Sequence, residues 1–382
     1  MTQRIVIVGA GVAGATAAKT LRSSGYSGEI VLLGAEGSQP YRRPMVSKEL
    51  LAGTAVERRM LLEAADFWPA QDIDLRTGSA VRGIDAERAR VYMTDDSEID
   101  YDALLLATGA RPRRLPGVGL GAHTLRGRGD IAPIRAAIDD GSLLIVGAGL
   151  IGCEVAATAA GLGAQVTVVH AGPTPLDRVA PETIGEFFRK LHADNAVQIH
   201  TDVVLTEIED VADGVLATAT DGRRWTAGAA LIAIGAVPET ALAGAAGVAV
   251  ADGILVDENY RTSIPGIYAA GDAAARFDPE LDEYVREEHW NSAQAQGAAA
   301  AKAMLGVTPD RAQVPWGWST QYGLNLQFAG RIRPGDELEV RGVPGTPDIA
   351  VLGRRGGRMT GAVAIGRPAD IRAARELIGA RG

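Results

Sequence analysis

The hydrophobic and polar positions of this chain repeat one plan twice: a buried strand, a glycine-rich turn, a helix and a second strand. The first copy opens with the β-branched run Arg4-Ile-Val-Ile-Val, and its second strand is predicted over residues 29–36. The second copy opens at residues 143–146, and its second strand is predicted over 165–170. Strands that alternate with helices in this way predict an α/β fold with two Rossmann-like domains.

The first turn has the spacing of a dinucleotide-binding fingerprint. Gly9 allows a tight turn, Gly11 lets backbone N–H groups approach a pyrophosphate, and Gly14 lets the following helix pack against the strand. Glu36 ends the second strand with a carboxylate that could hold a ribose hydroxyl pair. These features predict a dinucleotide site. The alternative is a structural glycine turn in another kind of α/β protein.

The second turn, with Gly147, Gly149 and Gly152, repeats this spacing, but its second strand ends in His170. An acidic residue at this position favours NADH, because a carboxylate binds the ribose diol and repels a 2′-phosphate. Histidine removes that repulsion, yet no arginine follows it immediately, as a dedicated NADPH site would need. We expect NADH with relaxed selectivity. An NADPH site, or an exposed histidine without a role, is the alternative.

The remaining elements follow from apolar runs and from alternation. They are short antiparallel strands within 79–101, a buried strand over 101–109, a helix over 181–194, strands within 197–233, strands at 253–257 and 266–272, an alanine-rich helix over 291–305 and a closing helix near 369–379. Ser47 is predicted to cap a helix that begins at Lys48.

The order of these elements predicts one dinucleotide-binding domain inserted in another. The outer domain is expected at 1–111 and 236–308, and the inserted domain at 112–235. Composition changes from about residue 309, so a smaller α+β domain is predicted over 309–382.

Composition and charge narrow the function. The 382 residues are 47% hydrophobic and 22% charged, as in ordinary α/β proteins, and the net charge of −9 argues against a nucleic-acid partner. Cys153 is the single cysteine, so an intrachain disulfide and a CxxC redox pair are excluded. We expect its side chain to be a small buried residue that fills space in the core, and we expect a cytoplasmic protein. Glycines interrupt the apolar stretches 1–21 and 143–169, so we expect no membrane segment. None of the five histidines is accompanied by other metal-ligating residues at the spacing of a metal site, so no metal site is expected.

Further motifs give the chain a specific resemblance over nearly its whole length. They are Arg43-Pro-Met-Val-Ser-Lys48, Leu106-Ala-Thr-Gly109, Ile267-Tyr-Ala-Ala-Gly-Asp272, Glu288-His-Trp-Asn-Ser-Ala293 and Pro315-Trp-Gly-Trp-Ser-Thr-Gln-Tyr322. With the two glycine turns, they resemble the flavoproteins of the pyridine nucleotide-disulfide oxidoreductase superfamily that lack the redox disulfide. Among these, the chain is similar to the ferredoxin, rubredoxin and putidaredoxin reductases of bacterial oxygenase systems.

The resemblance implies FAD in the outer domain, NADH or NADPH in the inserted domain, and a C-terminal part that helps to dock an iron–sulfur protein. It assigns cofactor-binding roles to Gly9, Gly11, Gly14, Glu36, Arg43, Lys48, Val81, Thr108, Arg126, Asp272 and Trp290, and on the nicotinamide side to Gly147, Gly149, Gly152, Glu154, His170 and Gly235. Val81 would act through its backbone. The alternative for Asp272 is a helix cap, and it could also serve both purposes, whereas Trp290 could simply be core packing. The family often has an aromatic residue where Gly317 stands.

The resemblance places Lys48 beside the flavin and lets Glu154 reach it, so these two are the predicted catalytic pair. Unpaired, each charge would be expensive to bury, whereas pairing stabilises both. Their expected work is to hold the nicotinamide and to tune the reduced state. The alternative is two unrelated exposed charges on helices.

The resulting prediction is a reductase that passes a hydride from NAD(P)H to FAD and then single electrons to a [2Fe–2S] ferredoxin, or to rubredoxin. We expect a monomer or weak dimer with a basic docking face. Its candidates are Arg42, Arg58, Arg59, Arg331, Arg333, Arg354 and Arg355. Two alternatives remain: an NADH oxidase or a nitrite or quinone reductase on the same scaffold, and a redox-responsive binding protein of the apoptosis-inducing-factor type.

Overall fold

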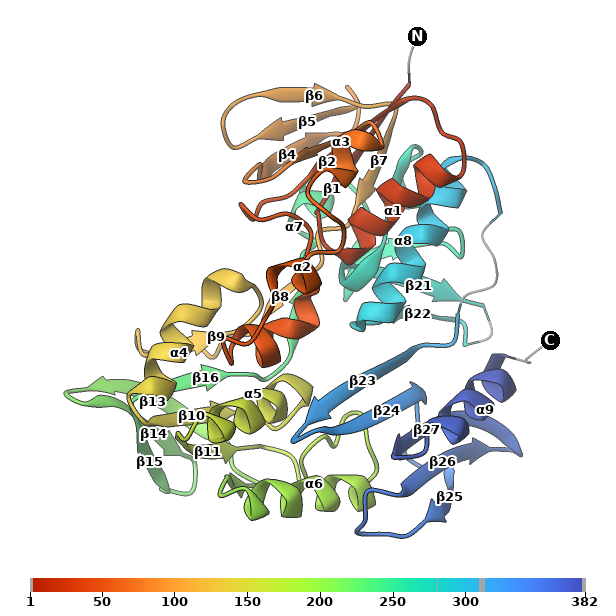
Figure 1. The fold of residues 1–382 in the computed structure, drawn as a ribbon. Coiled ribbons are helices and arrows are strands. Elements are labelled where there is room, and N and C mark those ends of the chain that lie inside the picture. The colour runs from red at the N-terminus through yellow and green to blue at the C-terminus, as the bar shows by residue number, and fades with distance from the viewer. Residues whose placement is uncertain (1–2, 280, 309–312, 380–382) are drawn as a thin grey trace. The chain divides into compact units, whose positions relative to one another are not determined.

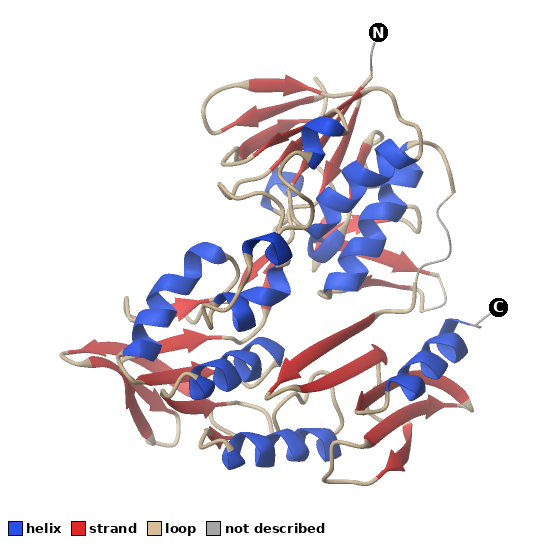
Figure 2. Cartoon of the chain, viewed as in Figure 1, coloured by secondary structure: helices blue, strands red, loops and turns tan. Residues whose placement is uncertain are grey.

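A computed structural model describes residues 3–279, 281–308 and 313–379 (Figure 1). The chain forms two compact units, each built from three segments. Unit 1 holds residues 1–42, 56–111 and 237–315, and unit 2 holds 43–55, 112–236 and 316–382. Parallel sheets flanked by helices occur in both units, which confirms the predicted α/β class (Figure 2). Within the described ranges, no helix is both long and apolar enough to span a membrane.

Unit 1 is centred on a five-stranded parallel sheet in the order β20-β7-β1-β2-β3. Its strands are β1 (Arg4–Val8), β2 (Glu29–Leu33), β3 (Ile73–Arg76), β7 (Ala103–Leu106) and β20 (Ile267–Ala269). Helix α1 (Val12–Ser23) packs against α8 (Trp290–Met304). The two helices can approach closely because Gly297 has no side chain. A Cβ atom at this position would clash with the Ala13 carbonyl oxygen.

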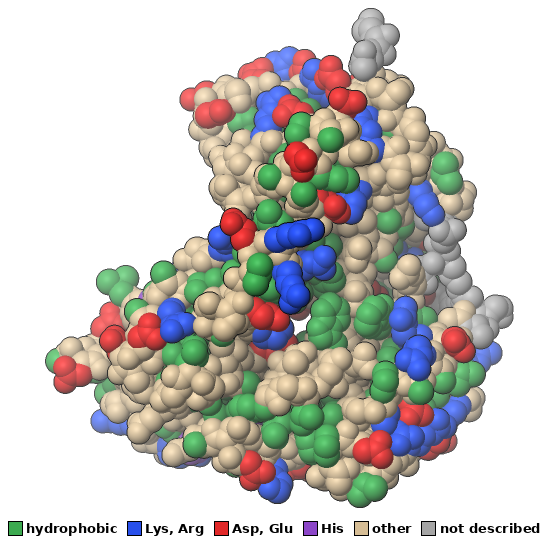
Figure 3. Space-filling view, viewed as in Figure 1, with side chains coloured by type: hydrophobic (Ala, Val, Ile, Leu, Met, Phe, Trp, Pro, Cys, Tyr) green, Lys and Arg blue, Asp and Glu red, His purple; other side chains and the backbone are tan. Residues whose placement is uncertain are grey.

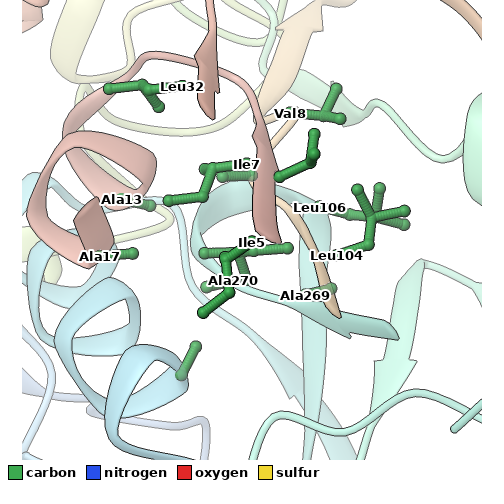
Figure 4. Packing of buried hydrophobic residues seen from close by; sticks show 14 of the residues in the cluster. Ile5, Ile7, Val8, Ala13, Ala17, Leu32, Leu104, Leu106, Ala269 and Ala270 are labelled. Carbon is green, nitrogen blue, oxygen red and sulfur yellow. The ribbon is translucent and has the colours of Figure 1, made fainter. Parts of the chain in front are cut away.

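The core of unit 1 lies between this sheet and these helices. Ile5 and Ile7 of β1, Leu104 of β7 and Ala17 of α1 are among its buried residues (Figure 4). The β-branched residues of the strands and the small residues of the helix let the sheet and the helix approach each other closely. The apolar area buried between them holds the carboxyl ends of the strands in place.

The other elements of unit 1 surround this core. They are α2 (Glu57–Met60), α3 (Phe67–Ala70), α7 (Ala241–Ala245), the antiparallel sheet of β4 (Val81–Asp85), β5 (Arg90–Met93) and β6 (Glu98–Asp100), and the sheet of β18 (Val250–Ala251), β19 (Gly253–Val256), β21 (Ala274–Asp278) and β22 (Glu283–Arg286). A 3₁₀ turn, η4 (Gly271–Ala273), follows β20. Strands β8 (Ala110–Pro112) and β17 (Ala236–Pro238) lie at the boundaries of the units.

Unit 2 contains a second parallel sheet, in the order β12-β11-β10-β16-β9. Its elements are β9 (Ala122–Thr124), η3 (Arg128–Asp130), α4 (Ile131–Asp139), β10 (Ser142–Val146), α5 (Leu150–Gly161), β11 (Gln165–Val169), α6 (Glu182–Asp194), β12 (Gln198–His200) and β16 (Ala229–Ile232). The antiparallel strands β13 (Leu205–Val211), β14 (Gly214–Ala219) and β15 (Arg224–Ala227) form a separate sheet.

The C-terminal part of unit 2 is an antiparallel sheet in the order β23-β24-β27-β26-β25. Its elements are β23 (Trp316–Gln321), β24 (Leu324–Gly330), β25 (Glu337–Gly342), β26 (Ile349–Arg355), β27 (Arg358–Ile365) and α9 (Pro368–Gly379). Strand β23 contacts α5, so this sheet is packed against the parallel domain of the same unit. The four-segment division of the chain into domains stays a prediction.

The prediction that Ser47 caps a helix is wrong. Arg43–Met45 form a 3₁₀ turn, η1, and Val46–Leu50 form a π-helix, η2, so Ser47 lies inside a helical segment rather than before it. The reason is a tertiary contact: the Ser47 hydroxyl donates to the Glu154 carboxylate instead of accepting a hydrogen bond from a backbone N–H group of its own helix.

The glycine turns lead to a matched stability prediction. A Cβ atom at Gly14 would clash with the Gly9 carbonyl oxygen, and one at Gly152 with the Gly147 carbonyl oxygen. We expect Gly14→Ala and Gly152→Ala to lower the free energy of unfolding by about 2–4 kcal/mol, because backbone atoms would have to move apart.

The controls are Gly11→Ala and Gly149→Ala, because a Cβ atom at either position has nothing within 4 Å. Urea unfolding followed by circular dichroism measures all four variants. Equal losses of stability in the two sets would show that the helices do not depend on this close approach.

Candidate functional site

The first glycine turn lies at the point of the unit 1 sheet where the strand order reverses. Strand β1 has β2 on one side and β7 on the other, and ligands of open α/β sheets bind beyond the carboxyl ends of the strands at such a point. Gly9 adopts φ +112°, and its N–H donates to the Leu33 carbonyl at 2.8 Å. Gly11 is the N-cap of α1 and has open space beside it. The turn is therefore a backbone cradle at a helix N-terminus.

Two carboxylates follow the carboxyl ends of two strands of this sheet, β2 and β20. Glu36 comes after β2 and accepts a hydrogen bond from the Tyr41 hydroxyl at 2.8 Å. Asp272 lies in η4 directly after β20, beside Gly271, whose N–H donates to the Gln296 side chain at 2.9 Å. The two carboxylates and the glycine cradle therefore follow the carboxyl ends of strands in the same sheet, as the parts of a dinucleotide site do.

The other residues predicted for unit 1 occupy different places. Val81 begins β4, and Trp290 is half-buried at the start of α8. The Thr108 hydroxyl donates to the Glu239 carbonyl at 2.7 Å, so it joins the loop after β7 to a segment far along the chain.

The second turn repeats this geometry in unit 2. Strand β10 lies between β11 and β16, Gly147 adopts φ +105°, and Gly149 is the N-cap of α5 with nothing within 4 Å of a Cβ atom built there. Gly235 follows β16 with φ +108°. These positions again form a backbone cradle at a strand-order reversal.

The expectation, within one alternative, that His170 is exposed is wrong. The His170 side chain is only 12% exposed. Its Nδ1 accepts a hydrogen bond from the Ala148 N–H in the glycine turn at 3.3 Å, and its Nε2 lies 3.3 Å from a carboxylate oxygen of Asp177. Asp177 could not be identified from the sequence, because a carboxylate seven residues after the strand end does not match the spacing of a nucleotide-binding motif.

Lys48 and Glu154 form an ion pair. Lys48 Nζ lies 2.6 Å from Glu154 Oε2, and the two side chains are 17% and 7% exposed. The alternative of two unrelated exposed helix charges is therefore wrong. A buried carboxylate needs more than one partner, and Glu154 also accepts from the Ser47 hydroxyl at 2.5 Å and from the Ser319 hydroxyl at 2.8 Å.

A hydrogen-bonded chain continues from Glu154 into the C-terminal sheet. Gln321 donates to the Ser319 hydroxyl at 3.2 Å, and its carbonyl oxygen faces His192 Nε2 at 2.9 Å. His192 Nδ1 lies 2.9 Å from the Tyr322 hydroxyl. This order makes His192 a donor through Nε2 and an acceptor through Nδ1, so each donor in the chain points toward Glu154.

Burial sets the protonation of the residues in this chain. Desolvation lowers the pKa of His192 to about 4, so the ring is neutral near pH 7. Burial raises the pKa of the Tyr322 hydroxyl, so it stays protonated and able to donate. The sequence motif at 315–322 indicated this strand, but only the fold brings His192 of α6 to it.

The remaining predicted residues have backbone partners. The Arg43 guanidinium donates to the Arg126 carbonyl at 2.8 Å, and the Arg126 N–H donates to Asp130 at 2.8 Å. The structure therefore brings Arg43 and Arg126 together. Cys153 is buried, as expected, and burial raises the pKa of its thiol. Over the described part of the chain, no group of three or more His, Cys, Asp and Glu side chains could hold a metal ion.

Comparisons with known proteins agree with this geometry. The family described as pyridine nucleotide-disulphide oxidoreductase matches residues 3–297, and a reductase C-terminal domain matches 316–382. The chain belongs to the pyridine nucleotide-disulphide oxidoreductase family. This confirms the resemblance drawn from the motifs.

Several members of the family are similar to the chain over almost its whole length. The ferredoxin–NAD(+) reductase component of an anthranilate 1,2-dioxygenase system from Burkholderia cepacia is 38% identical over 98% of this chain and 94% of its own length. Putidaredoxin reductase from Pseudomonas putida is 36% identical over 98% and 91%. The crystal structure of a covalent putidaredoxin reductase–putidaredoxin complex matches with a TM-score of 0.93 and 34% identity, over 98% of this chain and 93% of that one.

Family membership implies FAD and NADH, and the two cradles fit dinucleotides. At each one, the second glycine caps a helix of 12 residues and leaves open space where backbone N–H groups point outward. Such an end is an anion site, because unpaired N–H groups and the helix dipole both favour phosphate. The residues present therefore fit a pyrophosphate in each unit.

His192 leads to a pH prediction. Its pKa is about 4 in the folded protein against an ordinary value of 6.5. The unfolded chain therefore takes up a proton below about pH 6.5 that the folded protein does not bind. The contribution of His192 to stability is full above that pH and declines as the pH falls toward 4.

We expect wild type to lose about 1 kcal/mol of folding free energy more than His192→Gln between about pH 7.5 and about pH 5.5. Urea unfolding at the two pH values measures this. An equal decline in both proteins would contradict a neutral buried His192. His123→Gln is the comparison: burial lowers the pKa of His123 as well, but this side chain is only half-buried, so its removal should change the pH dependence less.

Proposed function

We propose that this protein is an oxygenase-type ferredoxin reductase, which passes a hydride from NADH to FAD and then single electrons to a small iron–sulfur protein. The supporting observation is the pair of glycine cradles, each at a strand-order reversal and each at a helix N-terminus. Relatives along the whole chain are named ferredoxin–NAD(+) reductases and putidaredoxin reductase. When bound, FAD would accept the electron pair and release electrons one at a time.

For FAD, unit 1 offers backbone and carboxylate groups. Gly9, Gly11 and Gly14 would admit the pyrophosphate, and Glu36 would accept from ribose hydroxyls. Asp272 would bind the hydroxyls of the ribityl chain. We further assign Val81, Thr108, Trp290, Arg43 and Arg126 to cofactor binding, where the arginines would stabilise negative charge.

For NADH, unit 2 offers the equivalent groups. Gly147, Gly149 and Gly152 would admit the second pyrophosphate, and Gly235, at φ +108°, allows the turn after β16. His170 would lie at the adenosine ribose. The fit of this cradle to a dinucleotide does not depend on any side chain, because backbone groups bind the phosphates.

We propose Lys48 and Glu154 as the residues that act at the reacting rings. Lys48 would supply a positive charge where negative charge develops, and Glu154 would hold the ammonium group in place. Ser47 and Ser319 stabilise the Glu154 carboxylate by donating to its two oxygens. The pair therefore starts in a fixed geometry and needs no reorganisation when the nicotinamide binds.

The proposed electron acceptor is a [2Fe–2S] ferredoxin, with rubredoxin as the second candidate. A basic face would guide an acidic partner. Among the candidates, Arg355 is paired with Asp336 at 2.7 Å and Arg354 lies 3.7 Å from Glu339, which offsets their charge. Arg58 and Arg59 are exposed on α2, and Figure 3 shows Lys and Arg side chains gathered where Figure 1 labels that helix.

We therefore favour a docking face formed by Arg42, Arg58 and Arg59. The Arg42 N–H donates to the Met60 carbonyl at 2.8 Å, so the three arginines come from adjoining backbone. We further propose a cytoplasmic protein that is a monomer or a weak dimer.

One experiment separates this function from its rivals. The purified flavoprotein is given NADH with ferredoxin, with rubredoxin or with oxygen alone, and the reduction of each acceptor is followed. Fast ferredoxin reduction with slow oxygen consumption supports the proposal. Fast oxygen consumption indicates an oxidase, and slow turnover with every acceptor indicates a redox-responsive binding protein.

We expect Glu154→Gln to slow flavin reduction by NADH about tenfold or more. The neutral amide leaves the Lys48 charge unpaired and free to move, while NAD⁺ affinity should change little. Anaerobic stopped-flow absorbance measures the rate.

Glu49→Gln is the matched control, because Glu49 is an exposed carboxylate beside Lys48 in the same π-helix. Equal rates in Glu154→Gln and wild type would remove the pair from the mechanism.

We also expect the double variant Arg58→Glu/Arg59→Glu to raise the apparent KM for ferredoxin about tenfold. Its ferredoxin reduction should also depend less on salt. Reduction of a small dye by NADH should be unchanged, since the dye needs no docking face.

The matched control is Arg223→Glu/Arg224→Glu, another exposed adjacent pair. An unaltered KM in the first variant would place docking elsewhere, with Arg331 and Arg333 as the next pair to reverse.

A further inference from the structure

We propose that Asp177 is the carboxylate that makes this protein prefer NADH over NADPH, in place of the acidic residue that the end of β11 lacks. This inference rests on the proposed function, because it concerns the nucleotide that the second cradle binds. It assigns the discrimination to a loop residue seven positions beyond the strand end.

The loop that holds Asp177 is fixed to the glycine turn itself. The N–H of Leu176, the residue before Asp177, donates to the Ala148 carbonyl at 2.8 Å, and Leu176 is buried. The N–H groups of Val179 and Ala180 donate back to the Leu176 carbonyl at 2.8 and 2.9 Å. Asp177 therefore has a defined position relative to the cradle before any nucleotide binds.

His170 joins the same two structures through its ring. Nδ1 accepts a hydrogen bond from the Ala148 N–H, and Nε2 lies 3.3 Å from the Asp177 carboxylate without a hydrogen bond to it. The carboxylate lies against Gly172, where a Cβ atom would clash with Asp177 Oδ2. A side chain at position 172 would therefore displace the carboxylate.

This arrangement puts a negative charge where the ribose is bound. In a dinucleotide fold the adenosine ribose lies at the end of the second strand, which here is His170. The Asp177 side chain is 26% exposed, so it remains accessible to a ligand. A ribose hydroxyl could donate to the carboxylate, whereas a 2′-phosphate would meet a like charge at short range.

Positive charge nearby does not reverse this expectation. The Arg178 side chain lies by Gly235, where a Cβ atom would be 3.4 Å from the guanidinium, and so it is directed to the end of β16 rather than to His170. Asp177 therefore supplies a carboxylate in contact with His170, the residue at the expected ribose position.

The test uses equilibrium binding to the FAD-loaded protein, with no turnover. Isothermal titration calorimetry compares ADP-ribose with 2′-phospho-ADP-ribose, which differ only in the phosphate. We expect wild type to bind ADP-ribose at least tenfold more tightly. Asp177→Asn should lower this ratio about tenfold, and Asp177→Glu should largely preserve it.

The control is Asp194→Asn, which changes the net charge equally but on the exposed face of α6, where Asp194 pairs with Lys190 at 2.6 Å. Its ratio should equal that of wild type. An unchanged ratio in Asp177→Asn, with both ligands still bound, overturns this inference and leaves the proposed function standing. Binding of neither ligand to wild type overturns both.

Discussion

The close approach of helix to strand at two glycines is the constraint on which the structure depends. Gly14 and Gly152 let α1 and α5 begin directly against the turns that precede them, since a Cβ atom at either would strike a backbone carbonyl. Each helix N-terminus therefore points at open space where a pyrophosphate can bind. The second of these contacts also fixes α5, from which Glu154 extends to Lys48 and Ser319.

The sequence could predict those parts of the fold that depend on local pattern. The glycine spacings, the β-branched strands and the antiparallel character of 79–101 are properties of neighbouring residues, and the structure has them. The partners of Glu154 come from segments more than 100 residues away, so no spacing indicates them. Ser47 shows the consequence: its local preference is to cap a helix, but the distant carboxylate takes its hydroxyl.

His170 shows a second limit of reasoning from sequence. The residue type alone suggested either relaxed selectivity or no role, because the ring was considered without its neighbours. The structure adds the Ala148 N–H on one side and Asp177 on the other, and the loop that carries Asp177 is held to the glycine turn by the Leu176–Ala148 hydrogen bond. Nucleotide selectivity is thus a property of a folded loop, whereas the presence of a nucleotide site is a property of a short motif.

The central claim is that this chain binds FAD and that NADH reduces it. An anaerobic titration of the purified protein with NADH, followed by visible absorbance, tests this most directly. The account predicts a yellow protein whose flavin absorbance is bleached by about an equimolar amount of NADH and returns when oxidised ferredoxin is added. A colourless protein that takes up no flavin on reconstitution, or a flavin that NADH leaves unchanged, would contradict it.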